Sequence, residues 1–139
     1  MTTYLVSIMA GRVAVVLCGC AILLPYLLRR NRLSVILGLA QQHAAPYLHR
    51  LWPHFWLGYL ILGLSIVHAG TVAGVMSRAN PAGIWAATIA LFLLMLEVLL
   101  GLSLKDVRLT GRTSVRRLHF WIMTILAGSL AAHLWLNAR

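Results

Sequence analysis

Four long apolar segments constrain the fold of this chain more than any other feature of its sequence. They cover about residues 4–28, 53–76, 82–104 and 116–136. A helix that crosses a lipid bilayer needs about 20 mostly apolar residues, and the last three segments reach this length without interruption. The first reaches it only if it extends back past Arg12. We therefore predict an all-α integral membrane protein in which residues 1–139 form a single membrane domain, a bundle of four transmembrane helices.

The composition excludes most soluble classes of protein. Hydrophobic residues make up 61% of the chain and charged residues 10%, whereas about 25% of an ordinary soluble domain is charged. The 12 Lys and Arg residues against 2 Asp and Glu residues give a formal net charge of +10. Such a balance often indicates nucleic-acid binding, but here acids are scarce because most of the chain is expected to lie in lipid. Membrane lipid is the expected partner, and nucleic acid is not.

The cationic residues are unevenly distributed among the connecting segments. Nine lie between the first and second apolar segments or between the third and fourth: Arg29, Arg30, Arg32, Arg50, Lys105, Arg108, Arg112, Arg116 and Arg117. The opposite side has three: Arg12, Arg78 and Arg139. By the positive-inside rule, both cation-rich segments face the cytoplasm and both termini lie outside it. We expect this orientation in a bacterial inner membrane.

Two of the connecting segments carry further signals. Residues 33–45 are apolar first and polar later, which predicts a short interfacial helix on the membrane surface between the first and second spans. Residues 77–81 contain Asn80 followed by Pro81, and both residue types favour a tight turn. We therefore expect a short connection between the second and third spans.

Four of the six histidines form a pattern on two of the predicted helices. His54 and His68 lie on the second span and His119 and His133 on the fourth, and each pair is 14 residues apart. Fourteen residues turn a helix back to within about 40° of its starting direction and advance it by about 21 Å. Each helix therefore presents one histidine near each end on a single face. The remaining two are expected to be solvated or interfacial loop residues: His43 and His49.

The second and fourth spans run in the same direction, so the histidines of the two helices are level. If these helices face each other, His54 stands opposite His119 and His68 opposite His133. Each pair can then place two nitrogens on opposite sides of one metal, and a haem fits between such helices with its iron bound from both sides. A single membrane histidine can instead be interfacial or hydrogen-bonded across helices, which explains the doubled spacing poorly. For His54, just after Pro53, an interfacial position stays open.

Two segments resemble the paired-histidine helices of di-haem b-type cytochromes: His54-Phe-Trp-Leu-Gly-Tyr through His68, and Arg116-Arg117-Leu-His119 through His133. This superfamily comprises cytochrome b561 proteins, ferric-reductase-like transmembrane domains and the four-helix haem core of the cytochrome b of quinol–cytochrome c reductase. The likeness covers residues 53–136, rests on spacing and helix order, and is closest in layout to the last two groups. The 139 residues contain neither the flavin and nicotinamide domain of a complete ferric reductase nor the further helices of a full cytochrome b, so the subfamily is not fixed.

The resemblance implies two haem b groups and one-electron chemistry. His54 and His119 would bind the inner haem iron, and His68 and His133 the outer one. The implied function is transmembrane electron transfer between membrane quinone or quinol and a partner redox subunit, and the small size of the chain implies such a subunit or a homodimer. Two other functions stay open: a cytochrome b-like membrane anchor of a larger oxidoreductase with one or no haem, and a small metal-binding or transport membrane protein.

Charged residues near the histidines are further candidates for a functional role. Haem propionates are anionic and attract guanidinium groups. Arg50, Arg116 and Arg117 are candidates at the inner haem and Arg12 at the outer one, and membrane orientation alone also explains each of them. Glu97 is the only acid within a span. It is a candidate proton acceptor at a quinone site near the inner haem, or a carboxyl group bonded to a neighbouring helix.

Overall fold

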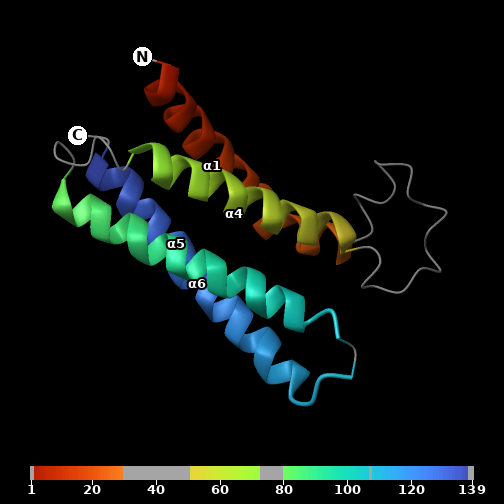
Figure 1. Cartoon of the computed structure of the whole chain (residues 1–139). Helices are drawn as coiled ribbons and strands as arrows, with labels where there is room; N and C mark the ends of the chain where they lie inside the picture. The colour runs from red at the N-terminus through yellow and green to blue at the C-terminus, as the bar shows by residue number, and fades with distance from the viewer. Residues whose placement is uncertain (1, 30–50, 73–79, 107, 138–139) are drawn as a thin grey trace.

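The computed structural model describes residues 2–29, 51–72, 80–106 and 108–137 (Figure 1). The interfacial helix expected at residues 33–45, the loop residues His43 and His49, and Arg50 lie outside the described residues. Within the described part, every regular element is an α-helix. The helices are α1 (Thr2–Arg29), α4 (Trp52–Val72), α5 (Pro81–Ser103) and α6 (Arg112–Asn137).

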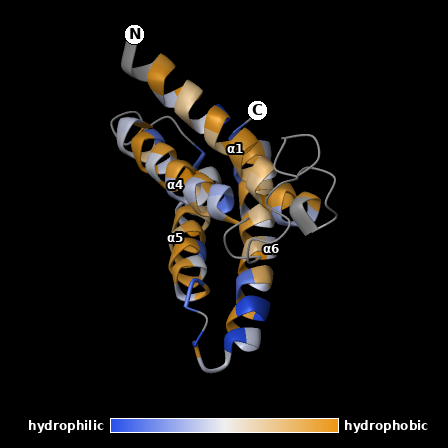
Figure 2. Ribbon diagram, turned by 90° about the vertical axis from the view of Figure 1, so that its right-hand side faces the viewer, coloured by the Kyte–Doolittle hydropathy of each residue, from blue (hydrophilic) through white to orange (hydrophobic). Residues whose placement is uncertain are grey.

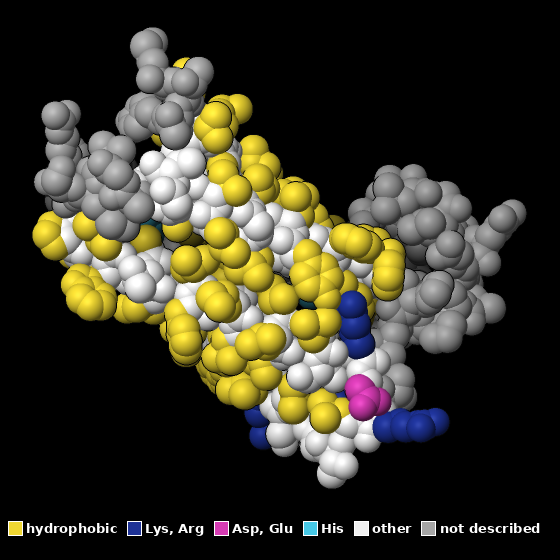
Figure 3. Space-filling model, in the orientation of Figure 1, with side chains coloured by type: hydrophobic (Ala, Val, Ile, Leu, Met, Phe, Trp, Pro, Cys, Tyr) yellow, Lys and Arg dark blue, Asp and Glu magenta, His cyan; other side chains and the backbone are white. Residues whose placement is uncertain are grey.

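All four described helices are long and apolar enough to cross a bilayer. The stretches of spanning length are Leu5–Leu27 of α1 and the whole of α4, α5 and α6, which confirms the predicted all-α class with four helices of this kind. Large apolar side chains such as Trp56, Trp85 and Phe92 are exposed. Figure 3 shows apolar side chains over most of the visible face, with charged side chains gathered at one end. Such a surface needs an apolar surrounding, which indicates an integral membrane protein.

Local sequence explains where two of the helices begin. Asn80 has an extended backbone (φ −61°, ψ 121°), and its side chain accepts a hydrogen bond from the backbone N of Ala82 at 3.1 Å, which is the geometry of an N-cap. Pro81 takes the first helical position, where its missing N–H costs no hydrogen bond. Gly111 precedes α6 at φ 76°, a conformation that glycine adopts without strain, and its carbonyl accepts from Ser114 N at 2.8 Å.

The start of α6 differs from the sequence prediction. The helix begins at Arg112, four residues before the predicted start of the fourth span at residue 116. Four of its first five residues, Arg112-Thr-Ser-Val-Arg116, are polar, so hydropathy alone places the boundary at their end. A helix continues past its apolar segment where a polar turn reaches water, because backbone hydrogen bonding and not hydropathy sets its end.

The helices form two pairs that meet through α4 and α5. α1 packs along α4, and α5 packs along α6, whereas α4 and α5 touch more sparsely and the α4 and α6 backbones hardly approach each other. Figure 1 shows the two pairs side by side, with the N and C ends of the chain at the same end of the bundle. In Figure 2 most of each helix is hydrophobic, and hydrophilic residues gather at the end of α6 away from the C-terminus.

A small core joins the two pairs near the middle of the bundle. It contains Ala21 of α1, Ile61 of α4, Ala90 and Leu94 of α5, and Leu126 of α6. Ile61 lies seven residues from each histidine of α4, and Leu126 lies seven residues from each histidine of α6. The core therefore separates two levels at which histidines of α4 and α6 can meet.

Candidate functional site

The four histidines of the sequence pattern meet in two pairs between α4 and α6. The ring centroids of His54 and His119 are 6.4 Å apart, and those of His68 and His133 are also 6.4 Å apart. The two rings of each pair are close to perpendicular, at 85° and 77°. The structure thus brings together both pairs that the 14-residue spacing predicts, one on each side of the central core.

Three of the four rings are held through Nδ1 by the backbone of a neighbouring helix. A carbonyl oxygen can only accept a hydrogen bond, so Nδ1 carries the proton in these rings and donates it. Nε2 is then the nitrogen with the free lone pair, which is the form of histidine that binds metals. The contacts are His54 Nδ1 to Ala21 O (3.1 Å), His68 Nδ1 to Ser7 O (2.8 Å) and His133 Nδ1 to Gly83 O (3.0 Å).

The fourth ring has an acid as its Nδ1 partner. His119 Nδ1 lies 2.8 Å from Glu97 Oε2, and Glu97, on α5, is buried with 8% of its surface exposed. The contact is short but does not have the geometry of a regular hydrogen bond, so His119 Nδ1 has no regular hydrogen-bond partner within the described chain. The other carboxyl oxygen, Glu97 Oε1, also has none there. The sequence left two roles open for Glu97: a proton acceptor at a quinone site, or a carboxyl group in contact with a neighbouring helix. The structure shows a contact of the second kind, with His119 of α6.

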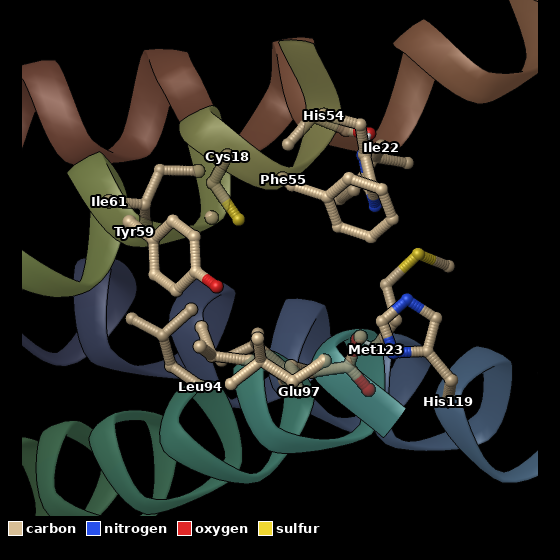
Figure 4. Close-up of a pocket in the computed structure, with 16 residues that line it drawn as sticks. Cys18, Ile22, His54, Phe55, Tyr59, Ile61, Leu94, Glu97, His119 and Met123 are labelled. Atoms are coloured by element: carbon tan, nitrogen blue, oxygen red, sulfur yellow. Dashed lines mark hydrogen bonds and ion pairs between the residues drawn. The ribbon is translucent and has the colours of Figure 1, made fainter. Parts of the chain in front are cut away.

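A hollow lies between the rings of His54 and His119. Its empty space comes to about 650 Å³ when the open mouth is included. Figure 4 shows His54 on one side and His119 with Glu97 on the other, with Phe55 and Tyr59 beside the space between them. All four helices contribute to the lining, which is mostly apolar. Such a lining excludes water and suits a largely apolar ligand fixed by a few polar groups.

At the other pair, α1 approaches His68 closely. Ser7 is buried with 2% of its surface exposed, and its hydroxyl oxygen lies 3.1 Å from His68 Nδ1. A Cβ atom at Gly11 would lie 2.9 Å from His68 Nδ1 and 3.0 Å from Cε1, which is closer than van der Waals contact, so any larger residue here would force the ring or α1 to shift. Sequence reasoning missed both residues. Their signal is two small residues four positions apart, a spacing common at close helix contacts in membranes.

Lys105, just after α5, lies among aromatic rings of α4. Its Nζ atom is 4.6 Å from the ring centroid of Phe55, 5.4 Å from that of Tyr59 and 5.7 Å from that of Trp52. It also lies 3.5 Å from the Tyr59 hydroxyl. Phe55 and Tyr59 border the hollow, so a cation lies near it. From the sequence, Lys105 is expected only to orient the chain in the membrane, because the aromatic residues that surround it belong to a distant segment.

Three of the four arginines predicted to contact propionates lie on the surface, and the fourth, Arg50, lies outside the described residues. Arg12 of α1 and Arg116 and Arg117 of α6 are exposed, and no arginine lines the hollow within the described ranges. Arg12 follows Gly11, which contacts His68, so it lies at the level of the second pair. The role of these arginines stays a prediction.

Each histidine pair offers two ring nitrogens to a bound group. In the part of the chain that the structure describes, no three or more His, Cys, Asp or Glu side chains are grouped so that they could hold a metal ion. Two histidine nitrogens could hold a metal only together with ligands from another source. Comparison of the chain with protein-family models, with curated proteins and with solved structures finds no match.

Proposed function

We propose that the chain is an integral membrane di-haem cytochrome of the b-type superfamily that carries electrons between the two faces of a membrane. The observation that carries the proposal is the arrangement of the four histidines: two pairs of facing rings, each ring with Nδ1 in contact with a polar partner. A histidine that binds a metal typically engages its other ring nitrogen in this way, which fixes the ring and increases the basicity of the ligating nitrogen.

The separation of the rings supports binding of one metal in each pair. A histidine nitrogen binds a metal at about 2.0–2.1 Å, and this nitrogen lies roughly 1 Å from the ring centre, so two rings on opposite sides of one metal have centroids about 6 Å apart. The centroid separation of 6.4 Å in both pairs fits this value. The apolar hollow beside His54 and His119 also suits the flat, mostly apolar haem ring.

The residues of the chain have clear parts in this function. When bound, haem b supplies one-electron oxidation and reduction at its iron, and two histidine ligands leave no iron position open for oxygen. The carbonyl groups of α1 and α5 orient the imidazole rings, and Glu97 does so for His119. Ile61 and Leu126 keep water out between the two levels. The levels are about 21 Å apart along the helices, a large part of the roughly 30 Å hydrocarbon core of a bilayer.

Electrons must enter and leave at the two faces, so the function includes partners. We propose membrane quinone or quinol on one side and a redox subunit, or a second copy of the chain, on the other. The exposed apolar surface supports a partner that is dissolved in lipid. The excess of cations in two connecting segments supports a bacterial inner membrane with both termini outside the cytoplasm.

Absorbance spectroscopy of the purified protein in detergent tests the proposal. Reduction by dithionite is expected to give the α-band of a bis-histidine haem b, and pyridine haemochrome analysis about two haems per chain. His133→Ala is expected to lose only the haem of its own pair, and His119→Ala only the other. His49→Ala is the matched control and is expected to keep both, because His49 is expected to be a solvated or interfacial loop residue and not a haem ligand.

The possible results separate the candidate functions. A folded wild-type protein without haem absorbance would refute the proposal. One haem per chain would favour a membrane anchor of a larger oxidoreductase. Loss of both haems in His133→Ala would show that the two pairs do not act independently.

A further inference from the structure

The two histidine pairs differ in the chemistry of their Nδ1 partners. The His68–His133 pair contacts neutral groups: two backbone carbonyls, the Ser7 hydroxyl and the Asn137 amide. In the other pair, His54 contacts a carbonyl, but His119 lies 2.8 Å from the carboxyl group of Glu97. Glu97 is the one acid within the four described helices, since Asp106 lies beyond the end of α5.

We propose that Glu97 is a positioning residue that lowers the reduction potential of a haem bound at His54 and His119 relative to one bound at His68 and His133. This inference rests on the proposed function. It concerns the difference between the two centres and not whether haem is bound.

The physical reason is the effect of a carboxylate on an imidazole ligand. The carboxyl group of Glu97 lies 2.8 Å from His119 Nδ1. A negative charge this close to the ring increases the electron density on Nε2, which makes the ring a stronger donor to the metal. A stronger donor stabilises the oxidised iron, which carries the greater positive charge, more than the reduced iron. Hydrogen bonding to the ligands is one of the means by which a protein sets the potential of a haem. A backbone carbonyl has the same direction of effect but no net charge.

The burial of Glu97 strengthens this effect. Glu97 is 8% exposed, its Oε1 atom has no hydrogen-bond partner among the described residues, and apolar residues such as Leu94 and Val98 line the same hollow. In an environment of low dielectric constant, charges interact more strongly than in water. A buried carboxylate is costly unless positive charge compensates it, and an oxidised iron held by His119 would provide such charge. The carboxylate and the oxidised centre therefore stabilise each other.

A difference in potential gives a direction to electron movement. If haem is bound at both pairs, an electron would move from the haem held by His54 and His119 to the haem held by His68 and His133, because the second would have the higher potential. The favoured direction would thus run from the end of the bundle where α5 ends and α6 starts toward the end where α1 starts and α6 ends (Figure 1).

Glu97→Gln tests the proposal, because glutamine keeps the size and an oxygen acceptor for Nδ1 but removes the charge. Optical redox titration of the wild-type protein is expected to show two distinct potentials. In Glu97→Gln the lower potential is expected to rise while the higher one stays the same. Asp106→Asn is the matched control, because it removes one negative charge outside the bundle and is expected to shift neither potential. A His133→Ala background, with one remaining haem, assigns the shift to the His54–His119 centre.

Several results would overturn the inference. If Glu97→Gln binds two haems per chain and both potentials are unchanged, the inference is wrong and the proposed function stands. The same conclusion follows if only the higher potential shifts. If Glu97→Gln loses haem, near-infrared magnetic circular dichroism of the oxidised wild-type protein decides instead. Two different ligand-to-iron charge-transfer energies are expected from the two centres, and a single shared energy would overturn the inference. A wild-type protein without haem would refute the proposed function, and the inference with it.

Discussion

Replacing Gly11 by alanine tests whether the close approach of α1 positions the second histidine pair. The added Cβ atom would lie 2.9 Å from His68 Nδ1, 3.0 Å from Cε1 and 3.4 Å from Cγ. His68 cannot move freely, because its Nδ1 donates to Ser7 O at 2.8 Å and its ring faces His133. The substitution must therefore shift either the imidazole ring or α1 itself.

The size of the effect follows from two opposing contributions. Alanine within a helix is more favourable than glycine by about 0.5–1 kcal/mol, because glycine loses more backbone entropy on folding. Forcing one extra carbon into a packed site costs about 1–3 kcal/mol. Gly19→Ala on the same helix isolates the first contribution, since a Cβ atom there meets nothing within 4 Å. We expect Gly11→Ala to be less stable than Gly19→Ala by about 1–3 kcal/mol, the cost of the added contact.

Two assays measure this difference. Thermal unfolding in detergent compares the two variants without reference to haem, and Gly11→Ala is expected to have the lower midpoint. Transfer of haem to an excess of a haem-scavenging apoprotein measures retention at each pair. If the whole cost falls on the second pair, haem there is bound about 5- to 150-fold more weakly in Gly11→Ala, since each 1.4 kcal/mol corresponds to a factor of ten. The haem at His54 and His119 is expected to be unaffected.

One outcome would refute the reasoning about α1. If Gly11→Ala unfolds at the same temperature as Gly19→Ala and retains both haems equally well, then α1 does not lie against His68 as the structure has it. Equal weakening of both haems would contradict the assignment of Gly11 to the second pair alone.

Three further substitutions have defined expectations. Ser7→Ala removes a hydroxyl group but keeps the carbonyl that accepts from His68, so we expect the free energy of unfolding to fall by at most about 0.5–1.5 kcal/mol. Transfer of haem from the second pair as fast as in Gly11→Ala would contradict this. Lys105→Met removes the cation above the rings of α4, with an expected loss of about 0.5–2 kcal/mol in unfolding free energy; Lys105→Arg, which keeps the charge, is expected to lose less. Asn80→Ala removes the N-cap of α5 and is expected to lower the free energy of unfolding by about 0.5–2 kcal/mol, measured by thermal unfolding. Asn80→Ser, which keeps a capping side chain, is expected to have nearly the stability of the wild type.

The pairing of the histidines could be predicted because it depends on helix geometry alone. The period of the α-helix fixes the relative direction of residues 14 positions apart, whatever surrounds the helix, and two alternate spans of a bundle run in the same direction. Only the rotation that turns the two faces toward each other had to be assumed. The contacts of Lys105 could not be predicted in this way, since they depend on where a connecting segment meets the start of α4.

The sequence by itself therefore determined the all-α class, the four helices of spanning length and the two levels of histidines, since hydropathy and helical periodicity are local properties. Only the tertiary structure decided what holds each ring. The carbonyl groups of Ala21 and Gly83 are available to His54 and His133 because of how α1 and α5 are rotated and shifted along their neighbours. The same register places Glu97 against His119. Rotation and shift result from the packing of all four helices together, and no pattern within one helix specifies them.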